Sequence, residues 1–361
     1  MSTMKAVLLR GFGGFEQLDY REDVAVPEPR AGEVRIQIGA AGLNNTDINT
    51  RTAWYSRSVT EGTTAAAAAA GHADASTQDS GWSGVGLHFP RIQGADACGR
   101  IVSVGAGVDA ARMGERVLVE PVFRVPGSRW PAGAIYFGSE CDGAFAEFTC
   151  VPSAHAHRID SALSDIELAG FPCAYSAAEN MLSRAAVTAA DTVLVTGASG
   201  GVGSAAVQLA RCRGATVFAV AGAEKAAALE SLGAARVIDR GANCAQALGQ
   251  DCVDVIIDVV GGAAFPSLLD VLRRGGRYAV AGAIAGPRVE LDLRTLYLKD
   301  LRLLGCTVLD HGVFDSLVRA IEDGRLQPLI AGVHALKDIV AAQQQFLTKR
   351  HLGKIVLVPN E

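Results

Sequence analysis

The pattern of apolar and polar positions changes character about halfway along the chain. Residues 34–38 alternate apolar and polar side chains (VRIQI), which is typical of a strand with one buried face. Up to about residue 160 such short strands are separated by frequent Gly and Pro turns, and this combination indicates a small barrel-like β domain. The other strands predicted in this part are 4–9, 116–119 and 144–151.

From about residue 165 the pattern predicts strands that alternate with helices. Residues 192–196 are a β-branched, apolar run that predicts a buried strand, and the apolar residues of 202–210 recur at helical spacing. Further predicted strands are 216–220, 237–238, 254–260, 277–280 and 301–308, and further helices are 166–182 (interrupted at Pro172), 224–232 and 264–272. This alternation predicts an α/β fold with a doubly wound parallel sheet.

Two segments stand outside this scheme. The tail is predicted to contain helices at 314–321 and 339–347 and a strand at 354–358. Residues 56–87 include six consecutive alanines and many Gly, Ser and Thr residues, which offer little to a core. We interpret 56–87 as a mobile insertion or lid with a short helical turn at the alanines. The aromatic residues expected to anchor its ends are Trp54, Trp82 and Phe89.

Composition limits the function classes. A length of 361 residues favours two domains, and 49% hydrophobic with 20% charged residues describes a soluble globular protein. The net charge of −5 and the lack of a basic cluster argue against nucleic acid as a partner. The sequence shows neither a bilayer-spanning apolar run nor a signal peptide, so we expect a cytoplasmic protein without a membrane partner. Its eight cysteines, without a C-x-x-C pair, indicate reduced thiols.

A glycine-rich turn joins the strand at 192–196 to the helix at 202–210. It reads Ala198-x-Gly200-x-x-Gly203, close to a dinucleotide fingerprint in the required strand, turn and helix context. Gly200 would let backbone amides approach a pyrophosphate, and Gly203 would let the helix pack against the strand. We therefore expect the turn to bind a dinucleotide through Ala198, Ser199, Gly200, Gly201, Val202 and Gly203. The alternative is a purely structural tight turn.

The end of the strand at 216–220 bears on the choice of dinucleotide. NAD binding usually places a carboxylate there for the ribose 2′-hydroxyl, but Gly222 follows this strand. Lys225 and Arg240 are cations that could approach a 2′-phosphate, so we expect NADPH rather than NADH. Against this, Glu224 lies one residue beyond the usual acidic position, and Lys225 could be a solvated helix residue. Gly282, after the strand at 277–280, completes the expected cofactor-binding set.

Several signatures together resemble the medium-chain dehydrogenase/reductase superfamily. They lie at residues 42–47, 94–105, 143–151, 193–203, 275–282 and 353–359. The resemblance implies a GroES-like catalytic domain of residues 1–160 and 309–361, in which the tail folds back. It also implies a Rossmann domain of residues 161–308, an active site between the two domains, and homodimers or homotetramers joined edge to edge through 301–308.

The metal ligands of the zinc-dependent branch are mostly missing. Its zinc enzymes have G-x-C-G-T-D where this chain has Asn44, and G-H-E where it has Gly94-Ala95-Asp96. Cys173 matches the third ligand position, and the closely spaced cysteines of the structural zinc lobe are absent. A catalytic zinc needs three protein ligands, so we expect none. The alternative is an atypical zinc alcohol or aldehyde dehydrogenase in which Asp47 or His72 joins Cys173 and Asp96.

The sequence resembles instead the zinc-free quinone oxidoreductase and enoyl reductase branch. There an N-x-x-D motif precedes a proton-donating tyrosine, and Asn44, Asp47 and Tyr55 fall at matching places. Asn44 would orient a substrate carbonyl or the nicotinamide ribose, or else cap a turn. Asp47 completes the candidate catalytic set, with purely structural hydrogen bonds as the alternative. Tyr55 could instead be an aromatic anchor, and Tyr175 is a rival acid.

The resulting hypothesis is an NADPH-dependent oxidoreductase that transfers hydride to a small conjugated carbonyl such as an enone, 2-alkenal or quinone. An acyl-CoA substrate is less expected, because no basic cluster is evident for its phosphates. The alternative from another class is a non-catalytic NADPH-binding sensor that retains the nucleotide site. His155 and His157, at the predicted domain junction, are interpreted as structural.

Overall fold

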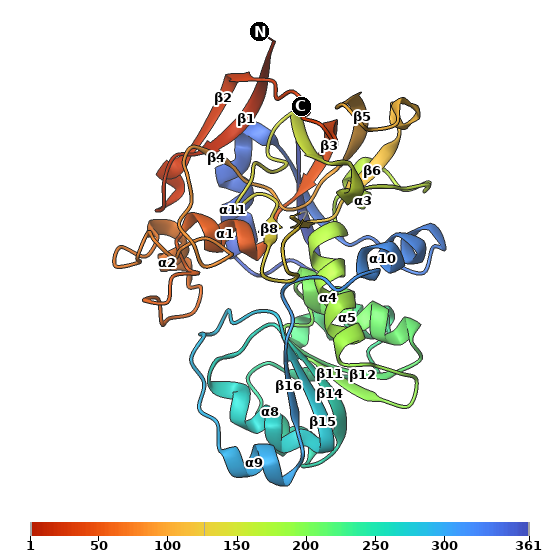
Figure 1. The fold of residues 1–361 in the computed structure, drawn as a ribbon. Coiled ribbons are helices and arrows are strands. Elements are labelled where there is room, and N and C mark those ends of the chain that lie inside the picture. Colours follow the sequence, from red (N-terminus) through yellow and green to blue (C-terminus); the bar gives the residue numbers. More distant parts are fainter. Residues whose placement is uncertain (1, 126, 360–361) are drawn as a thin grey trace. The chain divides into compact units, whose positions relative to one another are not determined.

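The structure is a computed structural model that describes residues 2–125 and 127–359. It separates into two units (Figure 1). Unit 1 contains Met1–Val59, Thr64–Cys173 and Phe314–Glu361, and unit 2 contains Thr60–Thr63 and Ala174–Val313. The first boundary therefore lies at 173/174 rather than at the predicted 160/161. Helix α3 (Asp165–Leu168) belongs to unit 1, where Arg116 forms an ion pair of 2.6 Å with Asp165.

Unit 1 is built from mostly antiparallel sheets to which the tail of the chain contributes, and among its described strands only the tail strands β17 and β18 pair in parallel. The larger sheet has the order β10-β6-β5-β3-β18-β17, with β9 also paired to β3, and a smaller sheet has the order β2-β1-β4. The strands are β1 (Thr3–Leu9), β2 (Leu18–Ala25), β3 (Glu33–Gly42), β4 (Arg91–Ile92), β5 (Cys98–Val104), β6 (Arg116–Val119), β7 (Val122–Arg124), β8 (Ala134–Tyr136), β9 (Phe148–Pro152), β10 (Ala156–Arg158), β17 (Ile330–Ala335) and β18 (Lys354–Val358). Val356 of β18 pairs with Gly42 of β3, so the tail completes the first sheet.

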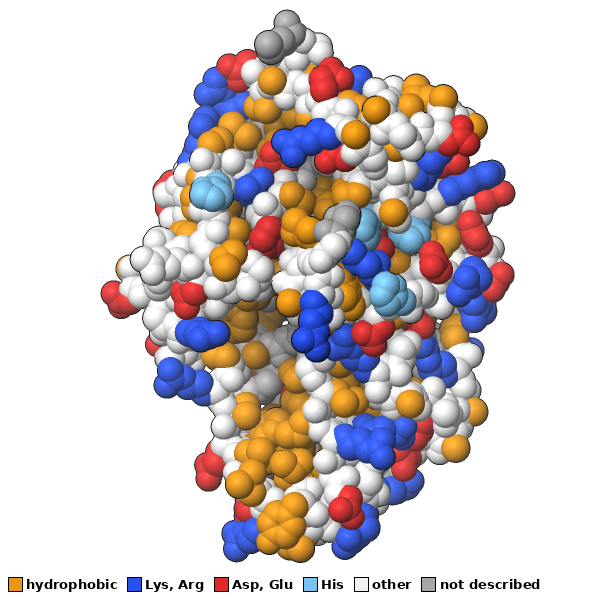
Figure 2. Space-filling view, in the orientation of Figure 1, with side chains coloured by type: hydrophobic (Ala, Val, Ile, Leu, Met, Phe, Trp, Pro, Cys, Tyr) orange, Lys and Arg blue, Asp and Glu red, His pale blue; other side chains and the backbone are white. Residues whose placement is uncertain are grey.

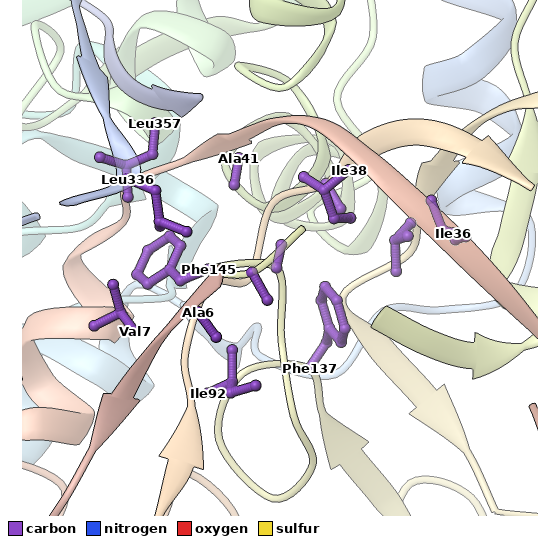
Figure 3. Packing of buried hydrophobic residues seen from close by; sticks show 14 of the residues in the cluster. Ala6, Val7, Ile36, Ile38, Ala41, Ile92, Phe137, Phe145, Leu336 and Leu357 are labelled. Carbon is purple, nitrogen blue, oxygen red and sulfur yellow. The ribbon is translucent and has the colours of Figure 1, made fainter. Parts of the chain in front are cut away.

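The core of unit 1 explains the alternating pattern of its strands. Ile36 and Ile38 of β3 are fully buried, whereas Gln37 between them is exposed. Figure 3 shows these isoleucines in one cluster with Phe137 and Phe145. The helices of this unit are α1 (Asn45–Arg51), α2 (Ala65–Ala70), α3, α10 (Val313–Glu322, whose first residue ends unit 2) and α11 (Ile339–Leu347). The helical turn expected at the alanines is therefore present as α2.

Unit 2 is a doubly wound parallel sheet. The strand order is β13-β12-β11-β14-β15-β16, which is the Rossmann order, and every neighbouring pair is parallel. The strands are β11 (Thr192–Val195), β12 (Thr216–Ala221), β13 (Arg236–Asp239), β14 (Val253–Asp258), β15 (Leu272–Val280) and β16 (Arg302–Gly305). The helices are α4 (Pro172–Arg184, whose first two residues belong to unit 1), α5 (Gly201–Cys212), α6 (Ala226–Leu232), α7 (Cys244–Leu248), α8 (Phe265–Val271) and α9 (Leu293–Leu298). The predicted α/β fold is confirmed.

The position of the chain reversal in unit 2 determines where a ligand binds. Strand β11 is central, and the chain crosses from it to β12 on one side and later continues from β14 on the other. Ligands of such sheets bind beyond the carboxyl ends of the strands at this reversal. Within the described residues, no helix is both long and apolar enough to cross a membrane.

Candidate functional site

The start of α1 is the first part of the site in unit 1. The Asn44 N–H donates to Asp47 Oδ2 at 2.7 Å, and the two residues form a capping box on the helix. Asp47 is 2% exposed, and burial raises the pKa of its carboxyl to about 7. The structural hydrogen bonds expected of Asp47 are therefore present.

The side chain of Asn44 lies in a buried polar network with Asp96 and Lys354. Lys354 Nζ lies 2.8 Å from Asp96 Oδ2 and donates to Asn44 Oδ1 at 2.5 Å and to the Leu43 carbonyl at 2.7 Å. Asn44 Nδ2 donates to Asp96 Oδ2 at 2.8 Å, and the Cys173 N–H donates to Asp96 Oδ1 at 2.5 Å. Both carboxylate oxygens of Asp96 thus have partners, and its charge faces an ammonium group.

This network bears on the zinc that the resemblance to alcohol dehydrogenases implies. Ala95 has no ligand atom, and the amide of Asn44 is committed to Lys354 and Asp96. Among the described residues, no group of three or more His, Cys, Asp and Glu side chains is placed to hold a metal ion. His72, also within the described chain, belongs to no such group either. The residues at these positions do not fit a catalytic zinc.

Two tyrosines and a cysteine lie beside this network. The Tyr55 hydroxyl donates to Thr46 Oγ1 at 2.9 Å, and its side chain is half-buried. Tyr136, which the sequence analysis did not single out, places its hydroxyl 3.0 Å from Cys173 Sγ. Burial raises the pKa of both tyrosines, and it raises the pKa of the Cys173 thiol to about 12. All three groups therefore keep their protons at neutral pH.

The rival acid Tyr175 has a different environment. It lies on α4 in unit 2, it is 2% exposed, and its hydroxyl accepts a hydrogen bond from Gln208 Nε2 at 2.9 Å. Burial also raises the pKa of Tyr175. The hydrogen bond between Tyr175 and Gln208 connects α4 to α5.

In unit 2 the glycine turn has the geometry that its sequence predicts. Gly197 adopts φ 56° and Gly200 caps α5, so the backbone amides at the helix start lie at the carboxyl end of β11. A Cβ added to Gly203 would lie 2.2 Å from the Gly197 carbonyl oxygen, which explains the need for glycine there. The predicted turn residues Ala198, Ser199, Gly201 and Val202 lie between or beside these glycines.

The end of β12 brings the predicted charged residues together. Lys225 Nζ donates to Ser199 Oγ at 3.2 Å, which ties the cation to the glycine turn. The Arg240 N–H donates to the Ala221 carbonyl at 2.9 Å, so Arg240 also lies beside the end of β12. Burial lowers the pKa of Lys225 and the Glu224 carboxylate opposes this. Asp239 of β13 pairs with Ala221, so two carboxylates, Glu224 and Asp239, lie beside the two cations at this position.

Two glycines at the carboxyl ends of the strands are too closely surrounded for a larger residue. The Glu224 carboxylate folds over Gly222, where an added Cβ would lie 2.4 Å from Oε2. A Cβ on Gly282, just after β15, would lie 2.9 Å from the Val259 carbonyl oxygen. The loops after β14 and β15 thus meet through backbone contacts, at the end of the sheet where a dinucleotide would bind.

The fold and the site define an oxidoreductase of the Rossmann type, and comparison with known proteins identifies the family. Residues 30–161 match the alcohol dehydrogenase GroES-like domain, and residues 201–323 match the zinc-binding dehydrogenase family. The chain belongs to the medium-chain dehydrogenase/reductase superfamily, in its quinone oxidoreductase-like branch, and is an NAD(P)H-dependent oxidoreductase.

Individual relatives align over nearly the whole chain. Acryloyl-coenzyme A reductase of Metallosphaera sedula is 27% identical, over 98% of this chain and 99% of its own. Quinone oxidoreductase of Rattus norvegicus is 27% identical, over 98% of each chain. A candidate alcohol dehydrogenase of Sinorhizobium meliloti has a solved structure with a TM-score of 0.88 and 46% identity, over 100% of this chain and 98% of the other.

Proposed function

We propose that the protein transfers hydride from NADPH to a conjugated carbonyl, such as an enone, 2-alkenal or quinone, without a catalytic zinc. The observation that carries this proposal is the network of Lys354, Asp96 and Asn44. Its ammonium group already balances the carboxylate, with Nζ and Oδ2 2.8 Å apart. A zinc ion would have to displace that cation and find ligands that the site does not offer.

The relatives support the same class of acceptor. Two of them are named for acryloyl-coenzyme A and for quinones, and in both acceptors a carbonyl is conjugated to a carbon–carbon double bond. Such an acceptor takes hydride at carbon and develops negative charge on the carbonyl oxygen. A tyrosine hydroxyl can stabilise that charge or supply the proton without a metal.

The nucleotide would be held by unit 2. The glycine turn of residues 197–203 and the start of α5 would bind the pyrophosphate through backbone amides. Lys225, Ser199 and Arg240 would bind the 2′-phosphate, and Gly222 and Gly282 would leave room for the ligand backbone. When bound, the reduced nicotinamide supplies the hydride.

In unit 1, Tyr55 would deliver the proton and Asn44 would orient the carbonyl or the nicotinamide ribose. Asp47 would hold the start of α1 through its bond to the Asn44 N–H. The insertion 56–87 would cover the acceptor. Supporting this, Trp82 of the insertion packs on Tyr136 with ring centroids 4.8 Å apart.

Two copies would associate through β16, the edge strand of the unit 2 sheet. Nearby, Leu293, Tyr297 and Leu298 of α9 are 63%, 61% and 55% exposed. Figure 2 shows hydrophobic side chains gathered on the face of this part of unit 2. An unpaired strand edge beside exposed apolar side chains favours a homodimer, with the homotetramer as a further assembly.

The proposed function is tested by NADPH consumption with chelator-treated protein. A 2-alkenal, a quinone and a simple aldehyde are offered in parallel, with NADH as the control nucleotide. We expect turnover of the alkenal or the quinone with NADPH. Turnover of the aldehyde alone, restored by added zinc, would support the atypical zinc dehydrogenase, and nucleotide binding without any turnover would support the sensor.

The choice of nucleotide is tested separately with Lys225→Ala. Removal of one cation from a 2′-phosphate site should weaken NADPH binding by about tenfold and leave NADH binding nearly unchanged. Fluorescence titration of the bound reduced nucleotide measures both affinities. Equal weakening for NADPH and NADH would mean that Lys225 does not contact the 2′-phosphate, and Arg240→Ala would then be compared in the same way.

A further inference from the structure

Tyr136 is held rigidly in unit 1. Strand β8 pairs with β7, with Tyr136 opposite Val122, and the Tyr136 N–H donates to Glu140 Oε2 at 3.1 Å. The next residue, Phe137, is fully buried in the core (Figure 3). On the other side the Trp82 ring lies 4.8 Å from the Tyr136 ring at 33°. The backbone, the following residue and a stacked indole therefore all fix this phenol.

The hydroxyl of Tyr136 faces a weak hydrogen-bonding partner, the Cys173 thiol, and either of the two atoms can be the donor. Its only hydrogen bond to a residue in the described part of the chain is the 3.0 Å contact with Cys173 Sγ. A neutral thiol sulfur accepts hydrogen bonds poorly, so the O–H could turn to an oxygen atom at little cost. The Tyr55 hydroxyl, in contrast, donates to the oxygen of Thr46 at 2.9 Å. Tyr136 is thus the tyrosine whose proton is more readily available to a ligand.

We propose that Tyr136 is a catalytic residue whose hydroxyl donates a hydrogen bond to the carbonyl oxygen of the acceptor. This inference rests on the proposed function. Hydride adds to the β-carbon, the electron pair of the C=C bond shifts toward the carbonyl oxygen to give an enolate, and NADPH is oxidised to NADP⁺. Tyr136 stabilises the enolate oxygen, and a proton from Tyr55 or water then reaches the α-carbon to complete the reduction.

Three features of the site suit this role. The hydroxyl stays protonated because burial and the neighbouring Cys173 raise the pKa of Tyr136. The side chain is 7% exposed, so its hydrogen bond to a developing charge would be little screened by water. Tyr55 is close enough to contribute to the raised pKa of Tyr136, so two phenols with separate tasks lie in one place.

The test compares Tyr136→Phe with the wild type in NADPH-dependent reduction of a 2-alkenal. We expect kcat to fall by about 10²-fold to 10³-fold while KM and NADPH affinity change only a few-fold. The matched control is Tyr20→Phe. It removes a hydroxyl on β2 of the smaller sheet that donates to Glu22 at 3.0 Å, and it should leave kcat unchanged. A kcat for Tyr136→Phe within threefold of the wild type would overturn the inference.

A binding measurement separates this inference from the proposed function. The probe is 4-nitrophenolate, whose charged oxygen resembles the enolate, titrated by absorbance in the presence of NADP⁺. The wild type should bind it at least tenfold more tightly than Tyr136→Phe, and equal affinities would count against the inference even if the alkenal is reduced. If no conjugated acceptor is turned over but this difference is found, the proposed function fails and the oxyanion contact stands.

A second variant guards against a fold defect in Tyr136→Phe. Trp82→Leu removes the stacked ring and keeps the Tyr136 hydroxyl. Because the phenol would then be less well oriented, kcat should fall by about tenfold at unchanged NADPH affinity. Unchanged kcat in Trp82→Leu, together with a normal melting temperature, would contradict the role of a fixed Tyr136.

Discussion

Lys354 shows how much one buried residue can decide at this site. Its ammonium group is 4% exposed and lies 2.8 Å from the fully buried carboxylate of Asp96. Two buried charges are tolerated in a protein interior only when they are paired and hydrogen-bonded, as both are here. Lys354 thereby balances a charge in the place where the resemblance to zinc alcohol dehydrogenases would imply a metal.

Lys354→Met should destabilise the protein strongly. Removal of the ammonium leaves the Asp96 carboxylate buried without its cation, at a cost of about 3–5 kcal/mol. Urea denaturation at pH 7 measures the loss, and Lys354→Met combined with Asp96→Asn should recover part of it. Arg10→Met, which breaks the exposed pair of Arg10 with Asp19, is the control and should change stability by less than about 1 kcal/mol. Additive effects in the double variant would contradict the pairing.

At the residue scale, sequence reasoning found the local motif and missed the distant partners. Asn44 and Asp47 stand three positions apart, so a capping geometry follows from the sequence alone. Lys354 is 310 residues from Asn44, and no local pattern connects them. A usable signal was present, because a lysine opens the apolar run of residues 355–358 and must find a partner once that strand is buried.

At the scale of elements, the alanine helix α2 shows how a segment with little core of its own is held. Arg51 of α1 is fully buried and donates to the Ala68 carbonyl at 2.7 Å and to the Gly13 carbonyl at 2.8 Å. It also donates to Gln343 Oε1 of α11 at 3.1 Å. One guanidinium group therefore ties α2 to α11 and to the loop after β1.

Arg51→Met should release α2. The variant loses these hydrogen bonds and leaves carbonyl groups without donors, so local opening of the insertion becomes easier. Limited proteolysis should cleave within 56–87 at least tenfold faster than in the wild type. Arg57→Met, at an exposed position of the same insertion, is the matched control. Equal cleavage rates for Arg51→Met and the wild type would show that α2 does not depend on Arg51.

Elements that do not contribute a regular buried face were the hardest to predict. Alternation of strands and helices was sufficient to predict that the sheet of unit 2 is parallel and doubly wound, because parallel neighbours need crossover helices. Helix α9 was not predicted. Its apolar residues Leu293, Tyr297 and Leu298 are exposed, so they do not form the buried face from which a helix is recognised in the sequence. Tyr136 was missed because its burial depends on Trp82 and Cys173, which lie far from it in the sequence.

A buried acidic residue makes the stability of unit 1 depend on pH. Burial alone would raise the pKa of Glu120, but hydrogen bonds from His155 and His157 and the charge of Arg124 outweigh it and lower the pKa to about 2. His155 Nδ1 lies 2.9 Å and His157 Nε2 3.2 Å from Glu120 Oε2. The two histidines interpreted as structural thus form hydrogen bonds with a carboxylate that lies between β6 and β7.

The sign of the effect follows from the lowered pKa. Ionised Glu120 contributes stability above the unfolded pKa near 4.5, and this is lost as the pH falls toward about 2. Glu120→Gln should therefore cost about 3 kcal/mol at pH 7 and progressively less between about pH 5 and pH 2. Urea midpoints at pH 7, 5 and 3 measure this, with the exposed Glu22→Gln as control. A wild-type advantage that grows in acid would refute it.

At the scale of the whole molecule, the sheets leave two edges whose strands carry an exposed apolar residue. Leu303 on β16 is 39% exposed and Val333 on β17 is 43% exposed, and each strand ends its sheet. Such an edge offers unpaired N–H and C=O groups to another strand. Only β16 is accompanied by the exposed apolar residues of α9, and this difference favours β16 as the contact between two copies.

Leu303→Lys should therefore convert a dimer into a monomer. A lysine on the edge strand places a charge where the second copy would pack, and edge lysines are a common obstacle to strand pairing. Light scattering after gel filtration should show half the wild-type mass for this variant and an unchanged mass for the matched Val333→Lys. Dissociation by Val333→Lys instead would place the contact on unit 1. A wild type that is already monomeric would mean that the apolar side chains of α9 serve a different partner.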